Sequence, residues 1–154
     1  MPGTLVRVSP RIATNRRVDR AAMLAFLRER THGVLLTTRR AGRPQASPVT
    51  YGVDPSGRVV VSTYPDRAKV RNAGRDATAS LVALSDDFDG PWLQVDGTAD
   101  VRTGAEAVEG LVEYYRAAAG EHPDWDEYRA AMVSDRRLVL RIRVTRLYGI
   151  AQPG

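Results

Sequence analysis

Short apolar segments joined by tight turns dominate the first half of the sequence. Their β-branched residues and their apolar–polar alternation predict strands over three ranges, 34–38, 44–53 and 59–63. Gly42 lies in the first connection, where a hairpin turn needs a positive φ, and Gly57 lies in the second. Strands this short and this closely connected favour antiparallel pairing, which constrains the fold more than any other feature of the chain.

The rest of the chain predicts helices around a continuing sheet. Further strands are expected over residues 78–85, 92–101 and 137–150. Helices are expected over residues 18–31, from Pro65 to the break at Gly74, and over residues 103–119 and 122–133. Few strand–helix–strand units are present. The sequence therefore predicts a mainly-β fold, a closed or partly closed antiparallel β-barrel with peripheral helices, as a single domain over residues 18–154.

Several residues mark the expected ends and irregularities of these elements. Gly33 suits a left-handed cap after the first helix, with His32 bonding its last carbonyls. Thr103 and Glu106 match a capping box at the start of the 103–119 helix. Gly97 predicts a bulge or a close backbone approach in the 92–101 strand.

The junction between the 59–63 strand and the following helix concentrates positive charge. Arg67, Lys69 and Arg71 lie in the first turns of a helix expected to begin at Pro65, and Lys69 is the single lysine of the chain. A helix N-terminus has unpaired N–H groups and the positive end of the helix dipole, so added cations favour binding of a phosphate or another anion. A capped surface helix with solvated charges fits this stretch equally well.

Two other strands carry anomalies. Pro44 and Pro48 cannot donate ladder hydrogen bonds, which predicts an edge or a backbone that pairs with something other than a strand. In the last strand, Arg146 shares the parity of the residues expected to face the core, Leu138, Leu140, Ile142 and Val144. Either the strand frays before Arg146, or Arg146 points into a polar cavity that holds an anion.

The charge balance argues against a nucleic-acid-binding protein. The net charge of +5 comes largely from residues 1–17, which hold four arginines and no acid. The remaining residues carry 19 basic and 18 acidic side chains. A basic face on the folded part is therefore not expected, and residues 1–17 are interpreted as a flexible basic leader.

The sequence lacks the features needed for disulfides, for metal sites, for a membrane span and for secretion. Without cysteine, neither disulfides nor thiolate metal sites can form, and the acidic loop 86–90 lacks the complete calcium-binding spacing, so no metal is expected. No apolar run is long enough to span a membrane and the N-terminus lacks the apolar core of a secretory signal, so we expect a cytoplasmic protein. No nucleophile–base set is recognisable, and the catalytic residues stay unassigned.

Four motifs together resemble one protein family. They occupy residues 42–47 (GRPQAS), 66–72 (DRAKVRN), 120–129 (GEHPDWDEYR) and 147–149 (LYG). The sequence resembles the FMN-binding split-barrel superfamily, which includes the pyridoxamine 5′-phosphate oxidases, and within it the actinobacterial branch that uses the deazaflavin coenzyme F420. The similarity covers roughly residues 20–150. It implies a homodimer with two cofactor sites at the subunit interface.

The resemblance also implies which residues contact the cofactor. They are Arg67, Lys69 and Asn72 at its phosphate, Gln45, Ser47, Pro48 and Val49 along its ring, Ser62 and Thr63 beside its ribityl chain, and Pro91, Trp92 and Arg146 from the second subunit. An inward-pointing Arg146 would thereby gain an anionic partner. The sequence lacks the longer C-terminal segment with phosphate-binding arginines found in true pyridoxamine phosphate oxidases, so that activity is not expected.

The implied activity is hydride transfer between coenzyme F420 and a small electron-poor organic substrate, whose identity the sequence does not give. Two alternatives remain: an FMN-binding flavoprotein like the pyridoxamine phosphate oxidases, and a non-catalytic F420-binding or carrier protein. Abundant arginine suits the long acidic tail of F420, but arginine–phosphate pairing suits FMN as well.

Overall fold

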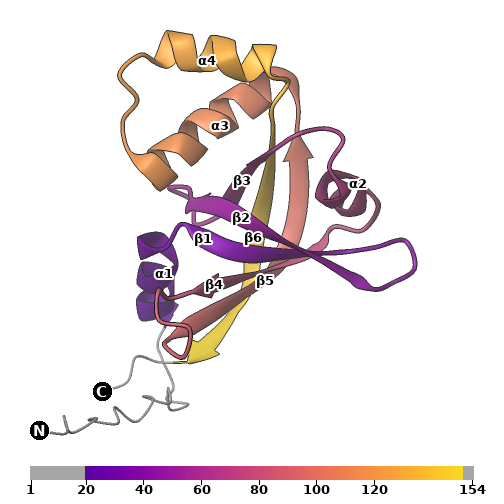
Figure 1. Cartoon of the computed structure of the whole chain (residues 1–154), viewed down its shortest axis with the longest axis vertical. Helices are drawn as coiled ribbons and strands as arrows, with labels where there is room; N and C mark the ends of the chain where they lie inside the picture. The colour runs from indigo at the N-terminus through magenta and orange to yellow at the C-terminus, as the bar shows by residue number, and fades with distance from the viewer. Residues whose placement is uncertain (1–19, 151–154) are drawn as a thin grey trace, which may run out of the picture.

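The computed structural model describes residues 20–150, which form six strands and four helices (Figure 1). In chain order the elements are α1 (Arg20–Glu29), β1 (His32–Thr38), β2 (Pro44–Val53), β3 (Val59–Thr63), α2 (Ala68–Arg75), β4 (Thr78–Leu84), β5 (Trp92–Arg102), α3 (Gly104–Ala119), α4 (Trp125–Ser134) and β6 (Leu138–Ile150). The strands pair antiparallel and close a barrel in the order β1-β2-β3-β6-β5-β4. The predicted antiparallel barrel with peripheral helices is confirmed. The basic leader predicted for residues 1–17 lies outside the described residues.

Strand β2 is fully paired on one side only. Residues 44–50 pair with β1, whereas pairing with β3 on the other side is limited to Tyr51, Gly52 and Val53. Within the described chain, the second edge of residues 44–50 therefore has no strand partner, as the two prolines predicted. Gly42, with a φ of 89°, makes the expected turn that leads into this strand.

The barrel interior is filled by alternate residues of its strands. Leu35, Tyr51, Leu81, Val95 and Ile142 are completely buried in one continuous apolar cluster. Burial of such side chains stabilises the fold by roughly 1.5–3 kcal/mol each before conformational entropy is counted. On β2, Ser47, Val49 and Tyr51 are partly or fully buried, while Ala46, Pro48 and Thr50 are exposed.

Helix α1 lies against β2, β5 and β6 (Figure 1). The Tyr51 hydroxyl donates a buried 2.8 Å hydrogen bond to the carbonyl of Leu27, which fixes the helix to β2. The prediction that His32 and Gly33 end this helix is wrong, since α1 stops at Glu29 and both residues belong to β1. Gly33 is needed there for space, because a Cβ would lie 2.8 Å from the carbonyl oxygen of Val82.

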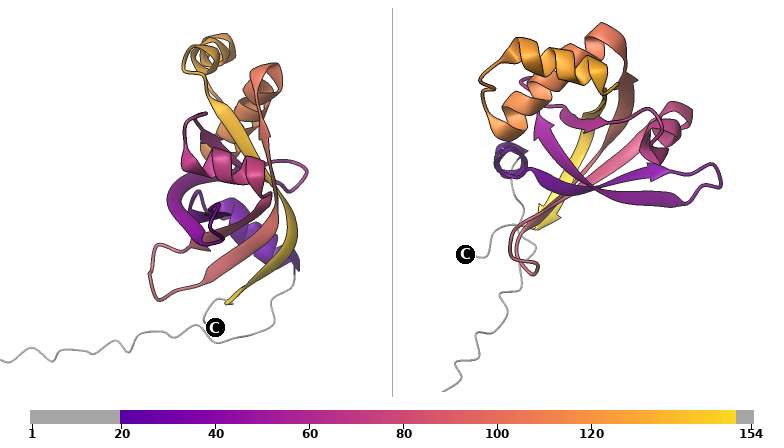
Figure 2. Two further views of the ribbon diagram at one scale, coloured as in Figure 1. Left: turned by 90° about the vertical axis from the view of Figure 1, so that its right-hand side faces the viewer. Right: turned by 45° about the horizontal axis from the view of Figure 1, so that its top comes forward.

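Helices α3 and α4 form a second layer over the outer face of β2, β3 and β6 (Figure 2). A separate apolar cluster joins Val60 and Val139 of the sheet to Leu111 of α3 and Tyr128 of α4. The Tyr128 hydroxyl donates to the carbonyl of Leu111 at 2.9 Å. Both faces of β3 and of the first half of β6 are thus covered, which explains their continuous apolar runs.

The starts of α3 and α4 differ from the sequence predictions. Thr103 is the N-cap of α3, but its side chain makes no capping hydrogen bond, so the predicted capping box is wrong. Glu106 instead accepts a 3.0 Å bond from Arg102. Helix α4 begins at Trp125, after an N-cap at Asp124 whose carboxylate accepts from the Glu127 N–H. The predicted start at residue 122 was therefore too early.

A β-bulge in the β5–β6 pair resolves the anomaly at Arg146. Asp96 pairs with Arg146, but the next residue, Gly97, pairs with Val144. One residue of β6, Thr145, therefore has no paired residue on β5. The inserted residue reverses the parity, which leaves Arg146 exposed and turns Leu147 toward the core cluster. Both sequence interpretations are therefore wrong: the strand continues to Ile150, and Arg146 does not point inward. The bulge predicted at Gly97 is confirmed, and a Cβ there would clash with the Arg143 carbonyl oxygen.

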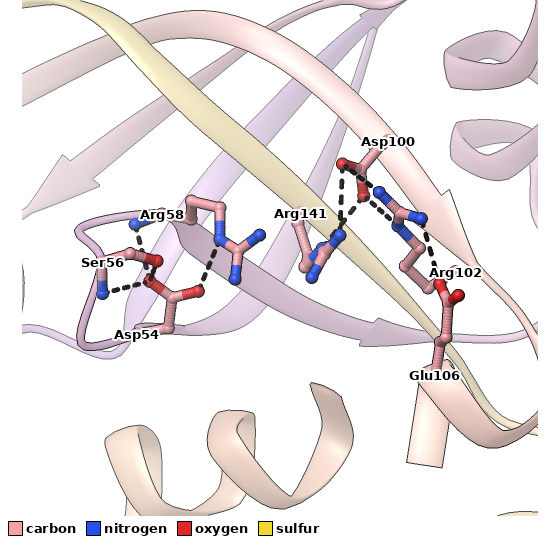
Figure 3. Close-up of polar contacts among 7 residues, drawn as sticks. All are labelled: Asp54, Ser56, Arg58, Asp100, Arg102, Glu106 and Arg141. Carbon is pink, nitrogen blue, oxygen red and sulfur yellow. Dashed lines mark hydrogen bonds and ion pairs between the residues drawn. The ribbon is translucent and has the colours of Figure 1, made fainter. Parts of the chain in front are cut away.

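Two polar clusters fix the strand connections beside α3 (Figure 3). The fully buried Asp54 carboxylate accepts from the N–H groups of Ser56 and Arg58 and from the Arg58 guanidinium at 2.7 Å. On the neighbouring strands, Asp100 accepts from Arg141 at 3.0 Å and from Arg102 at 3.3 Å. The carboxylates and guanidinium groups of these clusters bond to one another, so their role is structural. None of the helices in residues 20–150 is both long enough and apolar enough to cross a membrane.

Candidate functional site

The junction between β3 and α2 differs in one respect from its prediction. Helix α2 begins at Ala68 rather than at Pro65, because Tyr64 to Arg67 form a turn closed by the Arg67 N–H bonding the Tyr64 carbonyl at 3.2 Å. Arg67 is the N-cap, and its side chain makes no capping hydrogen bond. The first N–H groups of α2 therefore keep no side-chain cap, and Lys69 lies in the first helical turn.

Positive charge gathers around this turn. The guanidinium of Arg67 lies 5.7 Å from the Tyr64 ring centroid, and that of Arg137, from the start of β6, lies 4.2 Å from the same centroid. Within residues 20–150, neither arginine nor Lys69 forms an ion pair with a carboxylate. The ring of Tyr64 thus lies close to two guanidinium groups that have no carboxylate at ion-pair distance within residues 20–150.

The electrostatics of Lys69 fit an anion-binding role. Its partial burial lowers the pKa of Lys69, and the nearby Arg67 guanidinium lowers that pKa further. Both effects disfavour the charged ammonium, and both would be relieved by a bound anion. Anion binding by Lys69, and its alternative of a solvated surface lysine, both stay predictions.

Asn72 links the junction to the barrel. Its side-chain N–H donates to Thr37 Oγ1 of β1 at 3.1 Å, and its carbonyl accepts from Arg75 at 2.9 Å. The Thr37 hydroxyl in turn lies 3.4 Å from Oε1 of Gln45 on β2. Asn72 is only 7% exposed. Its amide therefore positions α2 against the sheet, and a direct contact with a cofactor stays a prediction.

The unpaired edge of β2 supplies a second set of polar groups. Gln45, Ser47 and Val49 all point to the inner side of this strand, where they are partly buried. The Ser47 hydroxyl oxygen is buried and has no hydrogen-bond partner within residues 20–150. A buried polar atom without a partner costs about 1–3 kcal/mol, so it marks a place where a ligand or water would be held. Figures 1 and 2 show α2 beside the β1–β2 hairpin that carries this edge.

Ser62 and Thr63 lie where β3 leaves β2 and turns toward α2. The Ser62 hydroxyl accepts a 3.1 Å bond from Nη1 of Arg137, and Thr63 is buried with 4% exposure. Both residues therefore stand between the unpaired edge of β2 and the cationic turn. Contact of either residue with a cofactor stays a prediction.

Pro91, Trp92 and Arg146 lie elsewhere. Trp92 and Arg146 are on the outer face of β5 and β6, where Trp92 packs edge-on against Tyr148 at 6.1 Å and the Arg146 guanidinium lies 5.0 Å from the Tyr148 ring centroid. Within residues 20–150, no hydrogen bond, ion pair or ring contact joins this group to the β3–α2 junction. Their predicted role, contact from a second subunit, stays a prediction.

Sequence reasoning missed Tyr64, Arg137 and Thr37 as members of the site. Tyr64 follows β3 and Arg137 precedes β6, and neither position carries a local pattern that indicates a binding role. The bond between Arg137 and Ser62 joins residues 75 positions apart, and no local pattern signals it. In the described part of the chain, no three carboxylate, histidine or cysteine side chains lie close enough together to hold a metal ion.

A comparison with known families decides the relationship of this chain. The profile of the pyridoxamine 5′-phosphate oxidase family matches residues 20–151. The chain belongs to this family. Among curated proteins, it is 30% identical over 129 residues to an F420H2-dependent biliverdin reductase of Mycobacterium tuberculosis (strain CDC 1551 / Oshkosh), covering 83% of this chain and 85% of that protein.

Solved structures share the fold. A conserved hypothetical protein from Mycobacterium tuberculosis superposes with a TM-score of 0.73 at 21% identity, covering 89% of each chain. A protein described as an F420 reductase gives a TM-score of 0.60 at 19% identity, covering 80% of this chain and 94% of that one. The resemblance to the split-barrel family inferred from four short motifs is confirmed.

Proposed function

We propose that this chain is an F420-dependent oxidoreductase, which transfers a hydride between coenzyme F420 and a small electron-poor organic substrate. The observation that carries the proposal is the cationic turn of Arg67, Lys69 and Arg137 beside the unpaired edge of β2. An anion-binding turn next to a strand with free polar groups suits a molecule that has an acidic handle and a flat heterocyclic ring. The F420H2-dependent relative supports the choice of F420.

The donor set fits such a cofactor. Arg67 and Lys69 are expected to bind its phosphate, since both cations lack a carboxylate partner within residues 20–150. Ser62 and Thr63 are expected beside its ribityl chain. When bound, the deazaflavin ring would supply the hydride, as redox cofactors do in general.

Residues of β2 are expected to orient the ring. The Ser47 hydroxyl, which is buried without a partner, and the free backbone edge around Pro48 and Val49 would bond its polar atoms. The Gln45–Thr37–Asn72 chain fixes this strand relative to α2 and so sets the distance between the ring and phosphate sites. No residue is assigned here as a proton donor to the substrate.

A second copy of the chain completes the site in this proposal. On the outer face of the sheet, the register aligns Pro48, Val34, Val82, Gln94 and Tyr148 in one row across β2, β1, β4, β5 and β6. Leu36 and Trp92 lie in the adjoining rows, and all these side chains are partly or fully exposed. An apolar sheet face of this extent supports association with another protomer. Pro91, Trp92 and Arg146 would then approach the cofactor held by the partner.

The relationship to pyridoxamine 5′-phosphate oxidases supports one alternative, an FMN-binding flavoprotein, because FMN also joins a phosphate to a flat ring. A non-catalytic F420 carrier is the other alternative. A side-by-side titration separates them. We expect purified protein to quench F420 fluorescence with saturation at one cofactor per protomer and to bind FMN at least tenfold more weakly.

Turnover distinguishes an enzyme from a carrier. Reduced F420 should be oxidised by the protein in the presence of a reducible compound, and biliverdin, the substrate named for the relative, is the first to test. Tight FMN binding with no F420 quenching would overturn the proposal in favour of the flavoprotein. Saturable F420 binding with no oxidation across a broad panel of conjugated substrates would favour the carrier.

A further inference from the structure

A cavity of about 630 Å³ adjoins the proposed cofactor site and shares Pro65 and Arg137 with it. It is bounded by the start of α3, the end of α4, the segment that leads into β6, and Pro65 of the β3–α2 turn. Figure 1 shows these segments meeting where the α3–α4 layer comes close to the β3–α2 connection. Its volume falls in the range of roughly 300–1,000 Å³ that is usual for small-molecule sites.

The wall of this cavity is mainly apolar. Its aliphatic part comes from both helices and from β6, and includes Val108, Met132, Val133 and Leu138. Val133 is 65% exposed although its neighbours are apolar. A surface of this kind gains free energy when an apolar body covers it, by roughly 25 cal/mol for each Å² removed from water.

Two consecutive arginines, Arg136 and Arg137, provide the polar part of the wall. Within residues 20–150 neither forms an ion pair, although Asp135 precedes them and lines an adjoining cavity of about 330 Å³ with Arg136. Nε of Arg137 is buried and has no hydrogen-bond partner in the described chain. Both the free charges and the unpaired N–H call for an anionic acceptor.

The start of α3 adds to this preference. Thr103, Gly104 and Ala105 line the cavity, and the Thr103 side chain leaves the first N–H groups of a 16-residue helix uncapped. Glu106 in the first turn is bound to Arg102 at 3.0 Å and does not fold back over the helix end. The positive end of the helix dipole therefore faces the same space as the two arginines.

We propose that this cavity binds a small amphipathic carboxylate, a molecule with one acidic group on an apolar body. The arginines and the α3 N-terminus would hold the carboxylate, and Val108, Met132 and Leu138 would cover the apolar body. A polyanion without an apolar part would leave these side chains uncovered, and a neutral lipid would leave the arginines unpaired. The proposal does not depend on the identity of the cofactor.

Decanoate is a suitable probe. Decanol serves as its uncharged counterpart, and the dipeptide γ-glutamylglutamate serves as an acidic molecule without an apolar body. We expect decanoate to bind in calorimetric titration and to shift the methyl resonances of Val108, Met132 and Val133, whereas decanol and the dipeptide each bind at least tenfold more weakly. Arg136→Asn should reduce decanoate affinity about tenfold. Asparagine tolerates the positive φ of 54° at this position, so the backbone need not change.

Arg39→Asn, in the exposed β1–β2 turn, is the matched control that removes one positive charge elsewhere. Equal losses of decanoate affinity in the two variants would overturn the proposal, as would unchanged methyl resonances of Val108, Met132 and Val133 on addition of decanoate. Dipeptide binding as tight as that of decanoate would also overturn it, in favour of a subsite for an acidic tail. Lys69→Ala should leave decanoate binding unchanged, so a failed cofactor assignment and a failed cavity assignment give different results.

Discussion

At the scale of single residues, Lys69 is the most informative side chain of the proposed site. It is the chain's single lysine, it lies in the first turn of α2, and its pKa is lowered by burial and by Arg67. The sequence identified its position, but not the presence of Arg137 beside Tyr64 of the same turn, because the pairing of β3 with β6 brings Arg137 there. Local patterns can show which residues share a turn, and they cannot show which distant strand ends beside it.

Lys69→Ala should weaken binding of F420 by about tenfold to a hundredfold, because a charge-assisted bond to phosphate contributes about 1.5–3 kcal/mol. Fluorescence quenching measures the dissociation constant. Arg143→Ala, an exposed site on β6, removes one charge away from the junction and should change affinity less than twofold. Comparable losses in both variants would mean that only net charge matters.

Asp54 gives a residue-scale prediction about pH. Burial would raise the pKa of this carboxyl, but bonds from the backbone and side chain of Arg58 and from Ser56 outweigh burial and hold its pKa below the usual value. A lowered folded-state pKa contributes stability above the unfolded value of about 3.9, and this contribution is lost as the pH falls through the folded value.

Asp54→Asn should therefore lower the free energy of unfolding by about 1–3 kcal/mol at pH 7. The difference from the wild type should shrink below about pH 4, where the Asp54 carboxyl becomes protonated first in the unfolded chain and then, at lower pH, in the folded protein. Urea denaturation at several pH values measures this. A difference that is constant from pH 7 to pH 3 would contradict the role of the ionised carboxylate.

At the scale of elements, most strands were predictable and helix starts were not. The bounds of β2 and β3 match the prediction because alternation and turn glycines define them in the sequence alone. The starts of α2 and α4 are each three residues later than predicted, because a proline can precede a helix as well as occupy its first turn. The predicted alternation of inward and outward residues on β6 is wrong beyond its bulge, because the apolar pattern of the sequence does not reveal the inserted residue.

The bulge predicts an unequal effect of two neighbouring substitutions. Leu147→Ala should lower the free energy of unfolding by about 2 kcal/mol, because Leu147 packs against the barrel core. Arg146→Ala should change it by less than about 0.5 kcal/mol, because Arg146 is exposed. Chemical denaturation compares the pair directly. The reverse order would mean that β6 keeps an unbroken alternation.

At the scale of the whole molecule, the proposed site is divided between two faces of the protomer. The cationic turn and the β2 edge lie at the β3–α2 junction, whereas Trp92 and Arg146 lie on the outer sheet face. The sequence alone could list both groups only by resemblance to a family. Their separation in one copy is a physical reason to expect assembly.

Val82→Asp, in the centre of the outer face, should convert a dimer into monomers and reduce F420 binding with it, because a charge would be buried in the interface. Sedimentation velocity and F420 titration follow the two effects, and circular dichroism checks the fold. Val133→Asp, on exposed α4, should leave the dimer intact. A wild-type protein that sediments as a monomer yet binds F420 tightly would contradict shared sites.

The almost exclusive use of arginine at the β3–α2 turn has a further consequence for how the protein responds to alkaline conditions. Guanidinium groups keep their proton throughout the range in which proteins stay folded. Lys69 is therefore the one cation of that turn able to discharge as the medium becomes basic, and its lowered pKa brings this change nearer to neutrality. Anion affinity should therefore fall in one step as the pH rises, when Lys69 loses its proton, while the arginines of the turn keep their charge.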